Sequence, residues 1–182
     1  INMVSSQIPS ESQTSLLAQY GSYNSELYRV LHGNTKGKLG YVLDYTRYGS
    51  NGFKELPSGA NTGFEKQDFV GKPSYDFNVF GVSQTIQAKY QYSDETSNET
   101  YVGLTDADFK ANPFQRYAGS EKDQMNTLHR QYMITHSFNF SPYLSLTTTA
   151  YQNEFGRNWY KLNDVGTTNG KFLLGGIFTD PI

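Results

Sequence analysis

The stretch at residues 143–153 constrains the fold more than any other part of the chain. Side chains alternate between the two faces of an extended strand. One set of alternate positions is largely apolar: Leu144, Leu146, Thr148 and Ala150. The other set carries hydroxyl and amide groups: Ser145, Thr147, Thr149 and Asn153. The run is about ten residues long, whereas soluble strands are typically about five or six and tilted membrane-spanning strands about nine to eleven. The pattern predicts a two-faced strand that could cross a bilayer.

The composition favours β-structure with aromatic belts over disorder. Hydrophobic residues make up only 36% of the chain, yet aromatic residues reach 15%, with 15 tyrosines. Disordered chains are poor in aromatic residues, whereas tyrosine suits both strands and membrane–water interfaces. The net charge of −2 gives no strong field for nucleic acid, so we expect no nucleic-acid partner.

Several classes of site and segment are not expected. The chain contains no cysteine, so disulfides and thiolate sites are excluded. No run of about 18 apolar residues is present, so no transmembrane helix is predicted. The first residues, 1–4, lack the basic start and apolar region of a signal peptide, so an exported protein would have its true N-terminus upstream.

Alternation of the same kind predicts about seven strands. They are expected at residues 15–20, 26–32, 38–48, 66–75, 83–94, 126–140 and 143–153. In the third strand Leu39, Tyr41, Leu43 and Tyr45 are predicted to face outward, and Gly40, Asp44 and Thr46 inward. In 26–32, apolar and polar residues are mixed evenly on both faces, so the sequence does not predict which face points outward. Pro73 predicts an irregularity or a strand end, because proline lacks a ladder donor.

The connections alternate in length. Short turns are expected at 33–37, 76–82 and 141–142, and longer loops at 49–64, 95–125 and from 156 onward. Within the second long loop, Thr105 and Asp108 fit a capping box that opens a short helical turn. Segregation of short turns from long loops is typical of outer-membrane barrels rather than soluble β-sandwiches. The predicted fold class is therefore all-β, an antiparallel up-and-down meander.

Several segments resemble TonB-dependent outer-membrane receptors. Residues 1–9 resemble the end of the plug domain, 20–24 the first barrel hairpin, and 41–53 the third strand with the start of its loop. Residues 101–109, 112–117 and 157–162 are similar to the branch related to ferric dicitrate receptors.

The resemblance implies a piece of a larger protein. Residues 1–13 would be the end of the plug and a linker, and 14–182 the N-terminal portion of a 22-stranded barrel with extracellular loops. It implies location in the bacterial outer membrane and import of a ferric chelate, either ferric citrate-like or a siderophore. The implied partners are this chelate, outer-membrane lipid and lipopolysaccharide, and TonB through a plug region outside this sequence. Cobalamin or a carbohydrate is the alternative cargo.

An enzyme is not expected. His32, His129 and His136 lie on separate predicted strands without metal-ligand spacing, and no nucleophile-elbow or phosphate-loop motif occurs. Asp106 and Asp108 lack the further oxygen ligands of a calcium loop, so capping explains them better. No catalytic residue, cofactor or metal site is therefore predicted. Two other classes remain open: a soluble or surface β-sheet glycan-binding module, and a small membrane-barrel enzyme.

The candidate ligand-binding residues are Arg116, Gln115, Arg130 and Arg157. A ferric chelate such as dicitrate is anionic, and arginine binds carboxylates through a planar, two-pronged fork. Arg116 is the first choice because it lies in the best-matching segment. The alternative roles are a solvated loop arginine or a contact to lipopolysaccharide phosphate. Trp159 and Tyr160 are expected in the outer aromatic belt. A hydrated inner wall is expected from Gln87, Lys89, Gln91, Gln131 and Thr135.

Overall fold

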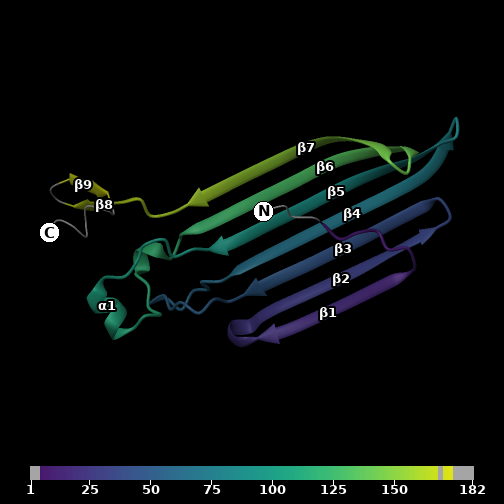
Figure 1. The fold of residues 1–182 in the computed structure, drawn as a ribbon. Helices are drawn as coiled ribbons and strands as arrows, with labels where there is room; N and C mark the ends of the chain where they lie inside the picture. Colours follow the sequence, from purple (N-terminus) through teal and green to yellow (C-terminus); the bar gives the residue numbers. More distant parts are fainter. Residues whose placement is uncertain (1–4, 168–169, 174–182) are drawn as a thin grey trace.

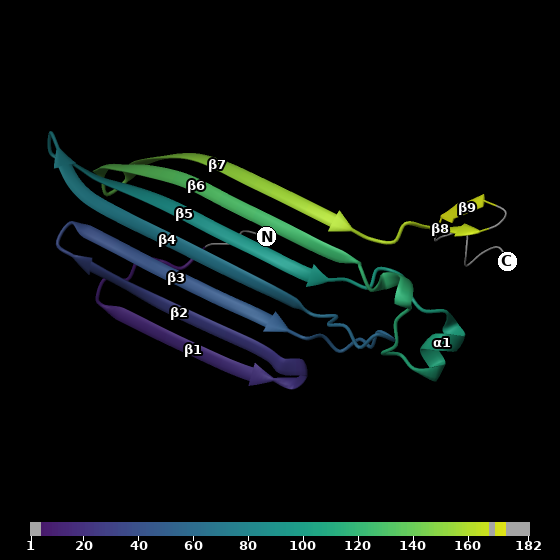
Figure 2. The same ribbon diagram turned by 180° about the vertical axis from the view of Figure 1, so that it is seen from behind.

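The protein is an open antiparallel sheet of seven strands, each paired with the next along the chain (Figures 1 and 2). This arrangement comes from a computed structural model, which describes residues 5–167 and 170–173. The strands are β1 (Gln13–Gly21), β2 (Ser25–Lys36), β3 (Leu39–Ser50), β4 (Phe64–Val79), β5 (Val82–Asn98), β6 (Gln124–Ser141) and β7 (Leu144–Tyr160). The predicted antiparallel meander of seven strands is confirmed.

The connections lie at two different ends of the sheet (Figure 1). Tight turns close the β2–β3, β4–β5 and β6–β7 hairpins at one end. At the other end lie the two long loops 51–63 and 99–123, the short η1 turn (Ser22–Asn24) and a small hairpin of β8 (Asp164–Thr167) and β9 (Gly170–Leu173). The second loop contains α1 (Asp106–Ala111) and η2 (Ala118–Ser120). The predicted separation of short turns from long loops is confirmed from β2 onward.

Several predicted boundaries are wrong, mostly because the strands are longer than expected: β2 runs through most of the turn expected at 33–37, and β5 continues beyond 94 to Asn98. The region 76–82 is mostly strand, with a turn only at Phe80 and Gly81, which have φ of 54° and 80°. A bulky residue with positive φ gives no turn signal in the sequence. Strand β7 continues through 156 to Tyr160, and β8 and β9 occupy a region expected to be loop. The part of that region beyond residue 173 lies outside the described residues.

The pairing register defines two faces, because directly paired residues point to the same side of a sheet. One, the apolar face, carries Leu16, Val30, Leu43, Phe69, Ile86, Ile134 and Leu146. The other, the polar face, carries Arg29, Asp44, Lys72, Gln87, Lys89, Gln91, Gln131, Thr135 and Thr149. The predicted division of the β3 side chains between two faces is confirmed. The register also orients β2, since Arg29 pairs with Thr46 on the polar face.

Nothing within the described residues covers the apolar face. Leu16 is 74% exposed, Ile134 54% and Leu146 52%. Tyrosines such as Tyr41 and Tyr75 flank the aliphatic side chains and are also exposed. In the described part of the chain, no helix is long and apolar enough to cross a membrane.

The N-terminal segment, residues 5–9, crosses the polar face (Figure 1). Lys72 Nζ donates to the carbonyl oxygens of Ser5 and Ser6, at 3.1 and 2.6 Å. Farther along, Thr35 Oγ1 donates to Pro9 O at 2.6 Å. Gly33 makes this approach possible, since a Cβ there would lie 2.6 Å from Pro9 Cδ. The segment is thus fastened to the sheet through its backbone.

Proline interrupts one ladder of the sheet. Pro73 pairs with Tyr41 on the β3 side, but the β4–β5 register has a gap between the Gly71–Tyr90 and Ser74–Gln87 pairs. Because proline has no N–H to donate, one ladder is lost while the other continues. The predicted irregularity is confirmed, and the strand does not end there.

Candidate ligand-binding site

The two long loops at one end of the sheet form one unit. Glu55 N donates to Phe114 O at 2.8 Å, and Arg116 N donates to Glu55 O at 2.7 Å. These bonds make a short parallel bridge between 51–63 and 99–123. Asn112 Nδ2 adds a bond to Glu55 Oε2 at 3.0 Å. The bridge fixes the backbone on both sides of Gln115 and ends at the backbone nitrogen of Arg116.

Asp123 anchors the base of this loop unit. Its side chain is almost wholly buried, at 2% exposure. Oδ2 accepts from Tyr101 N at 3.0 Å, and Oδ1 accepts from Leu162 N at 2.8 Å. A carboxylate accepting backbone N–H bonds makes strong, charge-assisted contacts. One side chain therefore joins the 99–123 loop to the chain that leaves β7.

Helix α1 is capped as predicted. Thr105 Oγ1 accepts from Asp108 N at 3.2 Å. Tyr117 OH donates to Asp108 Oδ2 at 2.6 Å, and Thr105 Oγ1 lies 2.8 Å from the same oxygen. The Tyr117 bond, helped by Thr105, holds the pKa of Asp108 below its usual value. Asp108 thus connects the start of the helix to the segment that carries Arg116.

The guanidinium of Arg116 is held at one end only. Its Nη1 donates to Pro113 O at 3.0 Å and to Gln115 O. The Nε and Nη2 groups form no hydrogen bond with a described residue. Arginine has five N–H donors in a rigid fork, so part of the fork stays free for an acceptor. A positioned guanidinium with free donors suits a carboxylate.

Lys54 supplies a second cation in the loop unit. It is half-buried, directly precedes Glu55 in the bridge, and takes part in none of the ion pairs among the described residues. Burial is the main cause that lowers the pKa of Lys54, and the charge of Arg116 lowers it further. The sequence analysis did not identify Lys54, because no motif marks it and only the bridge brings it near Arg116.

The other candidate residues lie elsewhere. Gln115 Nε2 donates to Asp108 O at 3.1 Å, so it supports the helix. Arg157 lies on the polar face of β7, with its guanidinium carbon 5.3 Å from the Trp159 ring centre. Arg130 lies on the opposite face, paired with Tyr92 and Glu154. The structure therefore brings together Gln115 and Arg116, and it separates Arg130 from Arg157.

An aromatic and cationic cluster lies beside the loop unit. Lys161 Nζ is 3.8 Å from the Tyr101 ring centre and 4.3 Å from that of Trp159. The two rings meet edge to face at 5.4 Å. The register places Trp159 on the polar face with Met125, contrary to the outer belt predicted for it. This cluster adds positive charge at the loop end of the polar face.

Within residues 5–167 and 170–173, His, Asp and Glu side chains form no group of three that could hold a metal ion. Arg116 and Lys54 place two cations on the hydrogen-bonded loops of the loop unit. In comparisons with protein-family models, curated proteins and solved structures, the chain matches none.

Proposed function

We propose that the chain is part of an outer-membrane TonB-dependent receptor that binds and imports an anionic ferric chelate, either ferric citrate-like or a siderophore. The observation that carries this proposal is the two-faced sheet. Its apolar face is exposed along long strands, and a backbone segment is fastened across its polar face. The resemblance of several segments to this family gives the proposal its specific form.

The membrane part of the proposal is supported by strand length and exposure. Strands β4 to β7 each contain 16 to 18 residues, which is more than a tilted strand needs to cross a bilayer. A water-soluble sheet would leave its exposed apolar side chains in contact with water at a cost. An open sheet also has free edges at β1 and β7 among the described strands. Barrels of this family have 22 strands in all. Closure with further strands would pair the free backbone groups at these edges inside lipid.

The receptor part is supported by the segment at residues 5–9. In a plugged barrel the chain must pass from the plug in the lumen to the first strand in the wall. A segment bound to the polar face by Lys72 and Thr35 follows that path into β1. A glycan-binding module on the surface of a soluble protein would give no reason for this placement.

The chelate part is supported by the loop unit. Ferric citrate complexes are anionic and present carboxylate oxygens. Arg116 offers free donors of a fixed guanidinium, and Lys54 adds a charge with no ion-pair partner among the described residues. Coupling to the inner membrane would come from TonB through the plug, which is the route the family resemblance implies.

Binding of ferric citrate to the full-length protein tests the function. We expect Arg116→Gln to weaken binding by about tenfold to a hundredfold, the effect of losing one charged hydrogen-bond pair. Lys54→Gln should weaken it less, since lysine acts as a point charge. Arg130→Gln is the matched control, because its side chain lies on the apolar face. Unchanged affinity in Arg116→Gln would remove the assignment of the site, and no binding of any ferric chelate to the unmodified protein would contradict the function.

A further inference from the structure

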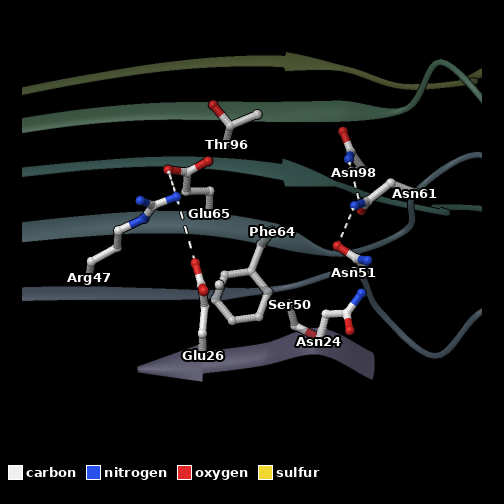
Figure 3. Close-up of a pocket in the computed structure, with 11 residues that line it drawn as sticks. Asn24, Glu26, Arg47, Ser50, Asn51, Asn61, Phe64, Glu65, Thr96 and Asn98 are labelled. Carbon is white, nitrogen blue, oxygen red and sulfur yellow. Dashed lines mark hydrogen bonds and ion pairs between the residues drawn. The ribbon is translucent and has the colours of Figure 1, made fainter. Parts of the chain in front are cut away.

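Residues 51 and 52 form an Asn-Gly pair at the start of the 51–63 loop. Asn51 is exposed, and both residues lie outside the strands and helices, directly after Ser50 at the end of β3. Figure 3 shows Asn51 among the residues that line a cavity of about 480 Å³ at the loop end of the sheet. Within the part of the chain that the structure describes, no other asparagine is followed by glycine.

An asparagine followed by glycine can lose its side-chain amide without an enzyme. The backbone nitrogen of the glycine gives up its proton and attacks the side-chain carbon Cγ, the Cγ–Nδ2 bond breaks, and the amino group takes up a proton and leaves as ammonia. Water then opens the five-membered ring at one of its two carbonyls. The product is aspartate, or isoaspartate, in which the main chain continues through the side-chain carbon. Glycine favours ring closure because no Cβ shields its nitrogen.

The reacting groups of this pair are placed for that chemistry. The leaving group, Asn51 Nδ2, forms no hydrogen bond with a described residue. The nucleophile, Gly52 N, donates to Ser50 Oγ at 3.1 Å and not to a backbone carbonyl of the sheet. Asn61 Nδ2 donates to Asn51 Oδ1 at 3.0 Å, and this oxygen gains negative charge when Cγ is attacked (Figure 3). The structure therefore supplies a donor at the atom that needs one.

Two neighbouring asparagines lack these features and serve as internal controls. Asn61 and Asn98 are joined by a hydrogen bond of 3.4 Å and lie beside Asn51 in Figure 3. The residues that follow them, Thr62 and Glu99, carry side chains next to the backbone nitrogen. Both of these nitrogens also donate to backbone carbonyl oxygens, at 3.1 and 2.8 Å. Neither nitrogen is as free to attack as that of Gly52.

The backbone around the pair leaves little room for a longer main chain. Asn51 N donates to Tyr23 O at 2.9 Å, and Asn51 O accepts from Thr62 N at 3.1 Å. A Cβ added to Gly52 would lie 2.5 Å from the backbone of Thr62, so the two ends of the loop pass in close contact. Isoaspartate adds a carbon to the main chain at this crossing. The two backbone bonds of residue 51 would then lose their geometry.

We propose that Asn51 deamidates spontaneously in the folded protein and that the isoaspartate product loosens the 51–63 loop. Through Glu55, the same loop holds the backbone nitrogen of Arg116, so the change reaches the whole loop unit. The reaction also adds a carboxylate to a cavity that Glu26 and Glu65 already line. It needs only water as co-reactant and no ligand, so it does not depend on the proposed function.

The first test ages the purified full-length protein in mildly alkaline buffer and follows each asparagine by peptide mass spectrometry. Replacing an amide NH2 by OH raises the peptide mass, and an isoaspartyl methyltransferase labels the isoaspartate. We expect residue 51 to convert at least about tenfold faster than Asn61 and Asn98, a difference that one hydrogen bond on the attacking nitrogen accounts for. Equal conversion at residues 51, 61 and 98, or none at residue 51, would overturn the inference.

The second test measures loosening by hydrogen exchange of the backbone amides. In aged protein we expect faster exchange than in fresh protein at Thr62 and Arg116, whose N–H groups bind the carbonyls of Asn51 and Glu55. Asn51→Gln is the matched control, because its longer side chain would have to close a less favourable, larger ring. Its exchange should not change on ageing. Isoaspartate at residue 51 without faster exchange, or equal acceleration in aged Asn51→Gln, would overturn the loosening.

Discussion

Arg29 and Asp44 form a two-pronged ion pair between β2 and β3, with Nε 2.9 Å from Oδ1 and Nη2 2.6 Å from Oδ2. Ser6 Oγ joins the pair, donating to Asp44 Oδ2 at 2.6 Å and accepting from Arg29 Nη2 at 3.1 Å. The Asp44 side chain is only 12% exposed. A charge pair on the sheet therefore holds the N-terminal segment by its side chain, while Lys72 holds its backbone.

Replacing Asp44 with alanine should destabilise the sheet. The substitution removes charge-assisted bonds and leaves Arg29 without its partner, so the free energy of unfolding should fall by about 2 kcal/mol. Denaturant unfolding in detergent measures the change. Asp68→Ala is the control on the same face, because its nearest cation, Lys66 Nζ, is 3.9 Å away and exposed. An exposed pair of this kind is worth about 0–1 kcal/mol. Equal effects of the two substitutions would contradict this role for Asp44.

Lys72→Met should release the N-terminal segment without unfolding the sheet. The variant keeps the length of the side chain but loses both bonds to the carbonyls of Ser5 and Ser6. A spin label at Ser5→Cys should become more mobile. Ser5 suits labelling because it binds Lys72 through its backbone carbonyl oxygen and not through its side chain.

Lys89→Met is the control for that measurement. Lys89 lies on the same face, but its Nζ donates to Gln131 Oε1 at 2.7 Å and does not contact the segment. The label should therefore stay immobile in this variant. A label that is equally mobile in both variants, or in neither, would show that Lys72 does not fasten the segment.

Helix α1 should loosen in acid. The pKa of Asp108 is lowered in the folded protein, so its contribution is complete above the ordinary value of 3.8 and is lost as the pH falls through the folded pKa below it. A ¹⁹F-labelled phenylalanine at position 109 should report the change below pH 3.8. Asp108→Asn should already be loosened at neutral pH and should lack this transition. A transition of the same shape in both proteins would assign it to another group.

The sequence predicted the strands better than their ends. Alternation located all seven strands and the two faces of β3, because mid-strand positions contrast apolar with polar side chains. At the ends the contrast disappears. Residues 95–98 of β5 are polar on both faces, so they were expected to be loop. The orientation of β2 depended on a partner: Leu27, Arg29 and Leu31 share a face by alternation, and only their pairing with Tyr48, Thr46 and Asp44 assigns that face to the polar side.

The candidate site was predictable only in part. Arg116 and Gln115 lie in one recognisable segment, and the structure keeps them together. Lys54 approaches them through the Glu55 bridge, which no local pattern encodes. The hydrogen bonds among Asn51, Asn61 and Asn98 were also missed, because they depend on how the 51–63 loop folds back and meets the end of β5.

The central claim is that the apolar face contacts lipid and the polar face does not. These 182 residues contain no cysteine, so each label position needs only one substitution among them. Neighbouring positions give matched pairs: Leu146 and Thr147 on β7, and Val30 and Leu31 on β2. The second pair compares two aliphatic side chains on opposite faces, which separates position from hydrophobicity.

The decisive measurement is quenching of a bimane label at each of these cysteines by brominated lipid, in full-length protein reconstituted in vesicles. We expect strong quenching at Leu146→Cys and Val30→Cys and little at Thr147→Cys and Leu31→Cys. Equal quenching within each pair, or none at any of the four positions, would contradict the account.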